Sequence, residues 1–563
     1  MQTSSRPTAR RFLHASLATD VLEPTLSPSI GARSRFGRGW LRLEAASGTR
    51  RGAALLFAVS LAVYGLQSLA VPLFAGRDLG TYLGYYDQFV HGAVQPMLML
   101  YRTPVAPLVV GPSLDFLGPA GTQVLLGVLF ACSVVAWSAA ALTFGPRAAL
   151  LTAAGLLAFP TYGYLFHAVS SDVVFAAAFS GWAYLLTRAT VEPSPLRFGL
   201  VGLGVALLAL VRPGNQVLVV FVLLPLVVRL PWRLRLASAA AFLAAVVIPL
   251  GLWATHNGVR YGDYVVNRGS GAFVPFFRMF VADHVIDPEN GPASRELART
   301  VERRLLPLEP YRSYRVTVED FFSKGDARMH EDLVNLSDQI WGWDDDYAKL
   351  RAAAWEAFEE HPGRYVSGVG RTIARELWTA SVYTPSAPKG EDGSGEGPVN
   401  ELGLPVPTEG SLIPAARMGL YSTTPDGSIR EVWTSPTEHR VVFADARDER
   451  RFEEVGEQYR LLSSGLPAYE PPEGPRRAFN LLSRLYPRAL LWLVLGLAGI
   501  LVRRPRHLLA AIAPALAGLL VITFTALGIS TVIEFATPVY PAFVVFAAAG
   551  LAGARRPRAE ATA

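Results

Sequence analysis

Charged and aromatic residues follow the first long apolar run of the chain, in the stretch 76–89, GRDLGTYLGYYDQF. The ionisable and aromatic residues of this stretch that we consider as candidate site residues are Arg77, Asp78, Tyr82, Tyr85, Tyr86 and Asp87. A carboxylate at the end of an apolar segment can remove the proton of a hydroxyl group, which makes Asp78 a candidate general base. The competing interpretation is that the charges mark a membrane boundary and the tyrosines anchor it in the aromatic belt. For Asp87 we favour the exposed face of a surface helix over a role in positioning a substrate.

Two arginines stand where an anionic group could be bound. Arg212 lies in LALVRPGNQVLVV (208–220), at an Arg-Pro break between two apolar runs. Arg102 lies in YRTPVAPLVVG (101–111), shortly before another apolar run. A guanidinium group binds phosphate as a bidentate fork, so Arg212 is the best candidate for a phosphate ligand and His256 is a weaker one.

Two acidic residues stand at the start of later apolar runs. Asp172 could take part in a site, or this region could cap its own helix through Ser170 or Asp172 itself. Glu534 would be costly in lipid, so we expect it to face a cavity or a partner. The nearby His167 is a lone histidine at the end of a span, which favours a structural role over a ligand role.

Three aspartates are packed among aromatic residues in WGWDDDYAKL (341–350). This pattern could bind calcium or a sugar. It lacks the glycine and the glutamate of an EF-hand loop, so an N-terminal cap of the following helix is the favoured interpretation.

The composition places these residues in a membrane protein. The chain has 563 residues, of which 51% are hydrophobic and only 17% are charged, which is too apolar for a large soluble protein. Its basic residues flank apolar runs and are not interleaved with aromatics, so nucleic acid is not an expected partner. The single cysteine, Cys132, excludes an internal disulfide and a CxxC site.

A membrane-spanning helix needs about 20 mostly apolar residues. The sequence therefore predicts an all-α polytopic membrane protein with about ten transmembrane helices. The candidate spans are Ala53–Leu73, Ala120–Phe144, Ala148–Phe166, Val173–Leu186, Phe198–Val211, Val217–Val228, Leu236–Thr255, Ala489–Val502, Leu508–Leu527 and Val532–Leu551. The spans beginning at Val173, Val217 and Ala489 are short, so they need flanking residues or snorkelling arginines to cross a bilayer.

The distribution of arginines predicts the orientation in a cell (plasma) membrane. Nine arginines precede Ala53, whereas the short loops assigned to the outer side hold only Arg77, Arg102 and Arg212. The positive-inside rule therefore places both termini in the cytoplasm. The predicted parts are a disordered basic tail (1–52), a first transmembrane part (53–255) with an external loop (74–119), an external segment between spans seven and eight (256–488), a second transmembrane part (489–553) and a cytoplasmic tail (554–563).

The external segment is predicted to be mainly helical and partly disordered. The stretch 347–378 has apolar residues at helical spacing, with a break at 361–363. The part after the break is predicted to lie on the membrane as an amphipathic helix. The stretch 386–410 is rich in glycine, proline and acidic residues, so we expect a mobile loop.

Five stretches occur in an order that resembles the GT-C superfamily of membrane glycosyltransferases, which includes protein O-mannosyltransferases and the aminoarabinose transferases of lipid A. They are YRTPVAPLVVG (101–111), SSDVVFAAAFSGWAYLLTRA (170–189), LALVRPGNQVLVV (208–220), WATHNGVRYGDYVVNRGSGAFV (253–274) and EFATPVYPAFVV (534–545). A cytoplasmic N-terminus, a first helix and an external loop with an early aspartate complete the resemblance. The chain departs from the family in having Phe535 and Ala536 where Arg-Tyr often follows the glutamate.

The resemblance implies transfer of a sugar from a polyprenyl phosphate to an acceptor on the outer side, which could be a glycan, a lipid or a protein. It implies that Asp78 is the general base and that the donor phosphate is bound by Arg212, with His256 as a second candidate. The substrate pocket would then be formed by Arg77, Tyr82, Tyr85, Tyr86, Asp87, Arg102, Asp172 and Glu534.

The chemistry of such a transfer needs few groups. A phosphate leaves without being protonated, so one carboxylate is sufficient and the acid partner of glycoside hydrolases is dispensable. A single direct displacement inverts the anomeric carbon. The scheme requires no cofactor and no metal, and the sequence offers no specific support for a divalent ion.

Two alternatives stay open. A secondary transporter commonly has two related halves, whereas seven predicted spans here precede the external segment and three follow it, which argues against a transporter. A catalytically silent GT-C relative that binds lipid or glycan is compatible with the altered last motif.

Overall fold

The computed structural model describes residues 43–268, 275–379, 399–401, 404, 412–413, 424, 426–436, 438–503, 505–529 and 535–553. The predicted tails lie largely outside these residues, as do Glu534 and most of the predicted mobile loop 386–410. Helix α2 (Arg50–Gln67) begins three residues before the predicted start of the first span at Ala53. It is capped by Thr49, whose Oγ1 accepts from the Gly52 N–H at 3.0 Å.

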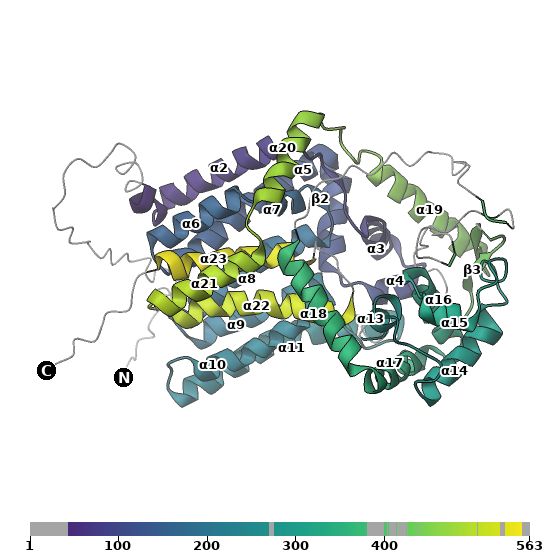
Figure 1. Ribbon diagram of the computed structural model, residues 1–563. Helices are drawn as coiled ribbons and strands as arrows, with labels where there is room; N and C mark the ends of the chain where they lie inside the picture. Colours follow the sequence, from purple (N-terminus) through teal and green to yellow (C-terminus); the bar gives the residue numbers. More distant parts are fainter. Residues whose placement is uncertain are drawn as a thin grey trace, which may run out of the picture. The chain divides into compact units, whose positions relative to one another are not determined.

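Apolar helices of different lengths lie alongside one another in the part of the chain that contains the predicted spans (Figure 1). Besides α2 they are α5 (Val105–Leu142), α6 (Pro146–Leu157), α7 (Pro160–Leu165), α8 (Ser171–Val191), α9 (Pro195–Val211), α10 (Leu224–Val227), α11 (Trp232–Tyr261), α21 (Ala489–Arg503), α22 (Leu508–Gly528) and α23 (Tyr540–Ala552). Among the described residues, four helical stretches are long and apolar enough to cross a membrane, and shorter apolar helices accompany them. The chain is therefore a helical polytopic membrane protein.

Several predicted span boundaries are wrong for physical reasons. The predicted span 148–166 is two helices, α6 and α7, because the residue before Pro160 is biased away from the helical region. The predicted span 217–228 is the 3-10 helix η1 (Pro213–Leu223) followed by α10. In contrast, α8 extends the short range predicted from Val173 at both ends, as a membrane crossing requires.

Most of the stretch 101–111 and of the second predicted span lie in one element, α5. Gly118 inside it has φ 64° and ψ −178°, and Pro119 follows, so the helix is kinked at this point. A positive φ is readily adopted only by glycine, and proline removes a helical N–H, which together explain the kink. The kink separates the part near α3 (Leu79–His91) and α4 (Pro96–Tyr101) from the apolar remainder.

The segment between α11 and α20 (residues 262–472, called the intervening segment below) is mainly helical in its described part, as predicted. Its elements are α13 (Phe276–Val281), α14 (Pro292–Thr300), η2 (Val301–Leu305), α15 (Val318–Ser323), α16 (Ala327–Ile340), η3 (Trp343–Asp345), α17 (Ala348–Glu360), α18 (Pro362–Trp378), β3 (Ile429–Trp433), β4 (His439–Phe443) and α19 (Ala446–Ser463). The predicted break at 361–363 is confirmed, because α17 ends and α18 begins there. The helix α20 (Glu473–Leu485) then leads into α21.

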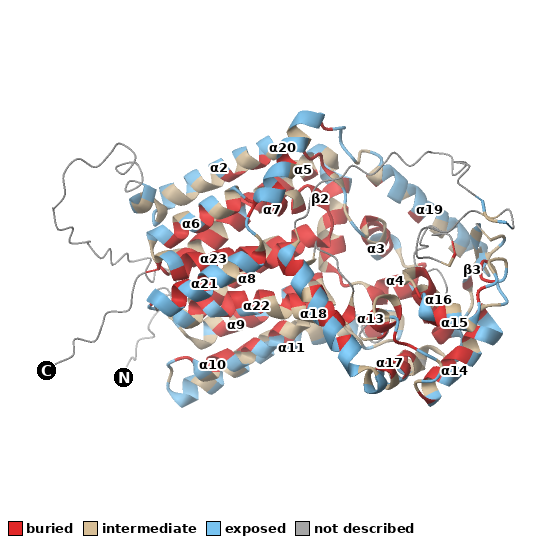
Figure 2. Cartoon of the chain, in the orientation of Figure 1, coloured by how far each residue is buried: buried red, intermediate tan, exposed pale blue. Residues whose placement is uncertain are grey.

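The described residues form two large hydrophobic cores and one small cluster. The first core lies among the apolar helices and the second in the intervening segment (Figure 2). The second core is built around Phe276, Phe280, Leu333 and Leu350. It also includes Met97 and Tyr101 of α4, so this short helix packs into the intervening segment.

Short strands that the sequence did not predict bring distant segments together. Strand β1 (Phe74–Ala75) pairs in parallel with β2 (Ala168–Val169), whereas β3 and β4 form an antiparallel hairpin. The Gly76 N–H extends the first pair by donating to the Val169 carbonyl at 3.2 Å. The β1–β2 pair therefore places the start of α3 beside the start of α8.

Candidate functional site

A cavity of about 410 Å³ lies where α3, α4, α8, η1 and α22 meet. Its charged residues are Arg77, Asp78, Arg102, Asp172 and Arg212. Its other polar residues include Tyr82, Tyr101, Thr103, Ser171, Asn215, Gln216 and Asn267. Its apolar side is formed by Val211, Pro213, Val521, Phe524, Ile529 and Phe535. The structure therefore brings six predicted site residues, Arg77, Asp78, Tyr82, Arg102, Asp172 and Arg212, to one cavity.

Asp78 is the residue immediately before α3, with φ 59° and ψ 14°. This left-handed conformation costs on the order of 1 kcal/mol for a residue with a side chain. The Asp78 side chain makes no capping hydrogen bond to the helix. Its Oδ2 instead lies 3.1 Å from Nη2 of Arg102, so the strained backbone directs the carboxylate toward the cavity.

Arg102 is held between aromatic rings at the C-terminal end of α4. Its guanidinium carbon lies 5.5 Å from the ring centre of Tyr82 and 5.7 Å from that of Tyr101. Both distances are typical of cation–π contacts. The side chains of Arg102 and Asp78 are 25% and 35% exposed, so their ion pair is reached by solvent inside the cavity.

A second ion pair lies in the same cavity. Arg212 Nη2 is 2.5 Å from Asp172 Oδ1, and Arg212 Nε and Nη2 donate to the Ser171 hydroxyl at 3.1 and 3.0 Å. The Tyr82 hydroxyl also donates to Ser171 Oγ, at 2.8 Å. Ser170, and not Asp172, caps α8, because its Oγ accepts from the Asp172 N–H at 3.1 Å. Ser171 thus links Tyr82, against which Arg102 packs, to Arg212.

Burial governs the protonation of Tyr82. Burial raises the pKa of its hydroxyl, and the charge of Arg102 opposes that increase. The hydroxyl is therefore a neutral donor to Ser171 near neutral pH.

Phe535 lies between two arginines of the cavity. Its ring centre is 4.8 Å from the guanidinium carbon of Arg77 and 4.9 Å from that of Arg212. Neither Phe535 nor Ser171 was predicted as a site residue from the sequence. Phe535 was noted only as a departure from the family pattern. Ser171 lies in the stretch 170–189 and Phe535 in the stretch 534–545, and the resemblance of these stretches to the family was the signal that could have identified them.

Four predicted site residues lie outside the cavity. Tyr86 donates to Asp115 Oδ2 at 2.6 Å, and Tyr85 is buried with its ring stacked near Phe89. His256 is not in a loop, because α11 continues to Tyr261, and its ring stacks on Trp253 at 4.9 Å. The positions of Tyr85 and Tyr86 follow from helical geometry, since both residues lie about 10 Å or more along α3 from Asp78.

Asp87 is buried and not on an exposed face, which corrects the sequence-based interpretation. Its carboxylate pairs with His91 Nδ1 at 3.0 Å and with Arg451 of α19. These residues and Asp115 line a second cavity that is more open to solvent.

The described side chains of the stretch 341–350 contact other segments, and the helix-capping contact that the sequence favoured is weak. The Trp343 ring packs on Arg268 and the Tyr347 hydroxyl donates to Asp338, while Asp345 Oδ2 accepts from the Lys349 N–H at a long 3.4 Å. Within the described ranges, no group of three or more His, Cys, Asp or Glu side chains could hold a metal ion. His167 is fully buried and stacks on Tyr64 at 4.2 Å, which supports a structural role.

Comparisons with known proteins give only a remote similarity. No protein-family model matches the chain, and no curated protein matches it. The solved structures that match include the crystal structure of ArnT from Cupriavidus metallidurans bound to undecaprenyl phosphate, with 14% identity, a TM-score of 0.31, and coverage of 89% of this chain and 77% of that chain. The apo structure of the same protein matches with 13% identity, the same TM-score, and coverage of 92% and 77%. A TM-score of 0.31 does not establish a common fold, so the function proposed next depends on the cavity and on the sequence motifs.

Proposed function

We propose that this chain is a membrane glycosyltransferase of the GT-C type. It transfers a sugar from a polyprenyl phosphate to a hydroxyl group of an acceptor, with inversion at the anomeric carbon. The observation that supports this proposal most is the presence of Asp78 and Arg212 in one cavity that also has an apolar side. A base, a phosphate ligand and a lipid-compatible wall are the three requirements of the reaction.

Asp78 acts as the general base. The acceptor oxygen attacks the anomeric carbon, its proton passes to the Asp78 carboxylate, and the bond between the sugar and the phosphate oxygen breaks. Oδ2 of Asp78 is engaged by Arg102, so we expect Oδ1 to receive the proton. Arg102 holds the carboxylate in the orientation that the transfer needs.

Arg212 binds the donor phosphate as negative charge develops on the leaving group. Its Nε and Nη2 contact Ser171 and Asp172, so we expect Nη1 to contact the phosphate. Phe535 packs against the guanidinium and restricts its movement, which favours a preorganised cation.

The apolar side of the cavity accommodates the first part of the isoprenoid chain. Val521, Phe524 and Ile529 come from α22 and its C-terminal end, and α22 is one of the helices long enough to span a membrane. The distribution of arginines supports an orientation with this cavity on the outer side of a cell membrane and both termini in the cytoplasm. The acceptor is accordingly an extracytoplasmic glycan, lipid or protein.

The test uses cells that lack the protein and are complemented with wild type, Asp78→Asn or Asp115→Asn. Mass spectrometry of cell-envelope glycans identifies the sugar that is added only when wild type is present. We expect Asp78→Asn to reduce this product by about 100-fold or more, because a positioned base typically contributes that much. Asp115→Asn is the matched control, since Asp115 contacts Tyr86 outside the cavity. An unchanged product in the Asp78→Asn cells, at equal protein levels, would contradict the proposal.

A further inference from the structure

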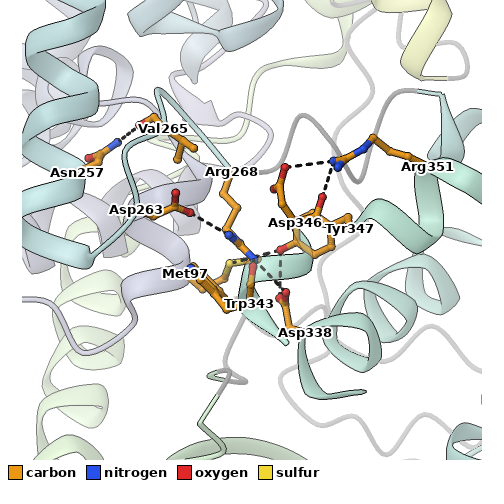
Figure 3. Close-up of polar contacts among 10 residues, drawn as sticks. All are labelled: Met97, Asn257, Asp263, Val265, Arg268, Asp338, Trp343, Asp346, Tyr347 and Arg351. Carbon is orange, nitrogen blue, oxygen red and sulfur yellow. Dashed lines mark hydrogen bonds and ion pairs between the residues drawn. The ribbon is translucent and has the colours of Figure 1, made fainter. Parts of the chain in front are cut away.

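A buried arginine, Arg268, lies behind the wall of the cavity that carries Arg102. It is only 4% exposed and follows α11 (Figure 3). Its Nη1 lies 2.9 Å from Asp263 Oδ2, and its Nη2 lies 3.5 Å from Asp338 Oδ1 and donates to the Trp343 carbonyl. Its guanidinium carbon is 3.5 Å from the centre of the Trp343 ring. The planar guanidinium thus joins four groups at once, which a lysine side chain cannot do.

This cluster contacts α4 in two places. The backbone N–H of Arg268 donates to the Leu100 carbonyl at 2.9 Å, and the contacts of the buried Arg268 side chain hold this donor in place. Tyr347 donates to Asp338 Oδ2 at 3.1 Å, and its hydroxyl oxygen also lies 3.9 Å from the Met97 sulfur (Figure 3). Both contacts lie within the six residues of α4, directly before Arg102.

The same stretch forms one wall of the cavity. Tyr101, Arg102 and Thr103 follow the contacted residues of α4, and Asn267 precedes Arg268, and all four line the cavity. A displacement of α4 would therefore move Arg102 relative to Asp78 without changing any residue that contacts substrate. Rate loss from a displacement of about 1 Å can reach about 100-fold.

We propose that Arg268 is a positioning residue for the transfer. It holds α4 so that Arg102 keeps the Asp78 carboxylate in its reactive orientation. The expected loss of rate depends on the proposed function. The restraint on the position of α4 does not depend on it.

A second buried arginine, which contacts α22 and the residue after it, provides a comparison. Arg278 of α13 is 2% exposed and donates through Nη1 to the carbonyls of Ala526 and Ile529, at 2.7 and 3.3 Å. It also pairs with Asp283 through two nitrogens, at 2.8 and 3.2 Å. Arg278 therefore holds the C-terminal end of α22, where the apolar side of the cavity lies, and its contacts do not include α4 in the described part of the chain.

The kinetic test compares Arg268→Gln, Arg268→Lys, Arg278→Gln and the control Arg351→Gln, in the purified full chain. The substrate is a polyprenyl-phosphate donor carrying the sugar that the glycan comparison identifies. We expect Arg268→Gln to lower kcat by about 100-fold with little change in KM for the donor, and Arg268→Lys to lie between it and wild type. Arg278→Gln should instead raise the donor KM, because it releases the apolar wall. Arg351 pairs with Asp346 at the surface, so its variant should match wild type.

An activity-independent measurement follows hydrogen–deuterium exchange of the α4 amides. We expect exchange over residues 96–102 to be about 10-fold faster in Arg268→Gln than in wild type or Arg351→Gln. If Arg268→Gln does not fold, Asp263→Asn tests the same restraint, because it weakens one anchor of the Arg268 guanidinium at a side chain that is 17% exposed.

The outcomes separate the two proposals. Unchanged exchange of α4 in both Arg268→Gln and Asp263→Asn would overturn the inference, as would equal losses of kcat in Arg268→Gln and Arg278→Gln. If wild type itself transfers no sugar, the proposed function fails, whereas faster exchange of α4 would still establish that Arg268 holds this helix.

Discussion

The carboxylate of Asp78 lies 3.1 Å from the guanidinium of Arg102, and both side chains line one cavity. Asp78 immediately precedes α3 and Arg102 immediately follows α4, so their contact depends on how these short helices pack. In the proposed reaction this contact orients the base, so the rate of transfer depends on Arg102.

Replacing Arg102 with glutamine should lower kcat by about 10- to 100-fold, because the Asp78 carboxylate loses its orienting partner. The stability of the protein should change by less than about 1 kcal/mol, since both side chains are partly exposed. Steady-state kinetics and thermal unfolding in detergent measure the two effects. Arg147→Gln, which removes an exposed pair with Glu44, is the control. A full rate in Arg102→Gln would show that Asp78 is oriented by other groups.

Replacing Arg212 with lysine should raise KM for the lipid donor by about 10-fold or more, because a lysine ammonium group cannot keep the contacts with Ser171 and Asp172 and also reach the phosphate. Binding of a polyprenyl phosphate to the purified chain measures this effect without any transfer. Arg188→Lys is a matched control, since Arg188 pairs with Glu192 at the end of α8 and does not line the cavity. Equal affinity of wild type and Arg212→Lys would argue against Arg212 as the phosphate ligand.

Replacing Phe535 with leucine should weaken donor binding by roughly 5- to 30-fold, because two cation–π contacts of about 0.5 to 1 kcal/mol each are lost. Phe535→Tyr keeps the ring and should bind as wild type does. The same binding assay compares the two variants. If leucine and tyrosine are equivalent at this position, the ring does not hold Arg77 and Arg212.

Glu376 on α18, outside the membrane-spanning helices, should make stability depend on pH. It is 1% exposed, and both carboxylate oxygens lack a hydrogen-bond partner among the described residues. Burial raises the pKa of Glu376 to about 8 from the usual 4.5. An acid with a raised folded-state pKa keeps its proton in the folded protein and loses it on unfolding, so this group lowers stability progressively between pH 4.5 and about 8.

Glu376→Gln should therefore stabilise the protein by on the order of 3 kcal/mol above pH 8 and by little at pH 4.5. Thermal unfolding in detergent across this pH range measures the difference. Glu360→Gln, at an exposed position on α17, should show no such dependence. A pH-independent difference between Glu376→Gln and wild type would contradict this explanation.

The sequence predicted the helical elements well where apolar runs were long. Run length is a local property, so α11 and α22 follow directly from composition. Proline breaks were less predictable: Pro160 divided one predicted span, whereas Pro249 lies inside the continuous helix α11. Whether a proline ends a helix depends on the packing that compensates the lost hydrogen bond.

The candidate site was predicted in part. Asp78, Arg102 and Arg212 stand at the ends of apolar runs, and charged residues at such positions are few enough to be identified from the sequence. In contrast, Asp87 appeared to be an exposed helical residue, yet Arg451 from a segment more than 350 positions away buries it. No local pattern encodes that contact.

By itself, the sequence determined that this is a helical membrane protein with ionisable residues at the ends of its apolar runs, because hydropathy and charge are properties of neighbouring residues. Only the tertiary structure decided which of those ends meet. The β1–β2 pair places Asp78 near Ser171, Phe535 packs between Arg77 and Arg212, and Arg268 secures α4. Each of these contacts joins residues far apart in the chain, and it forms only when both helical cores are packed.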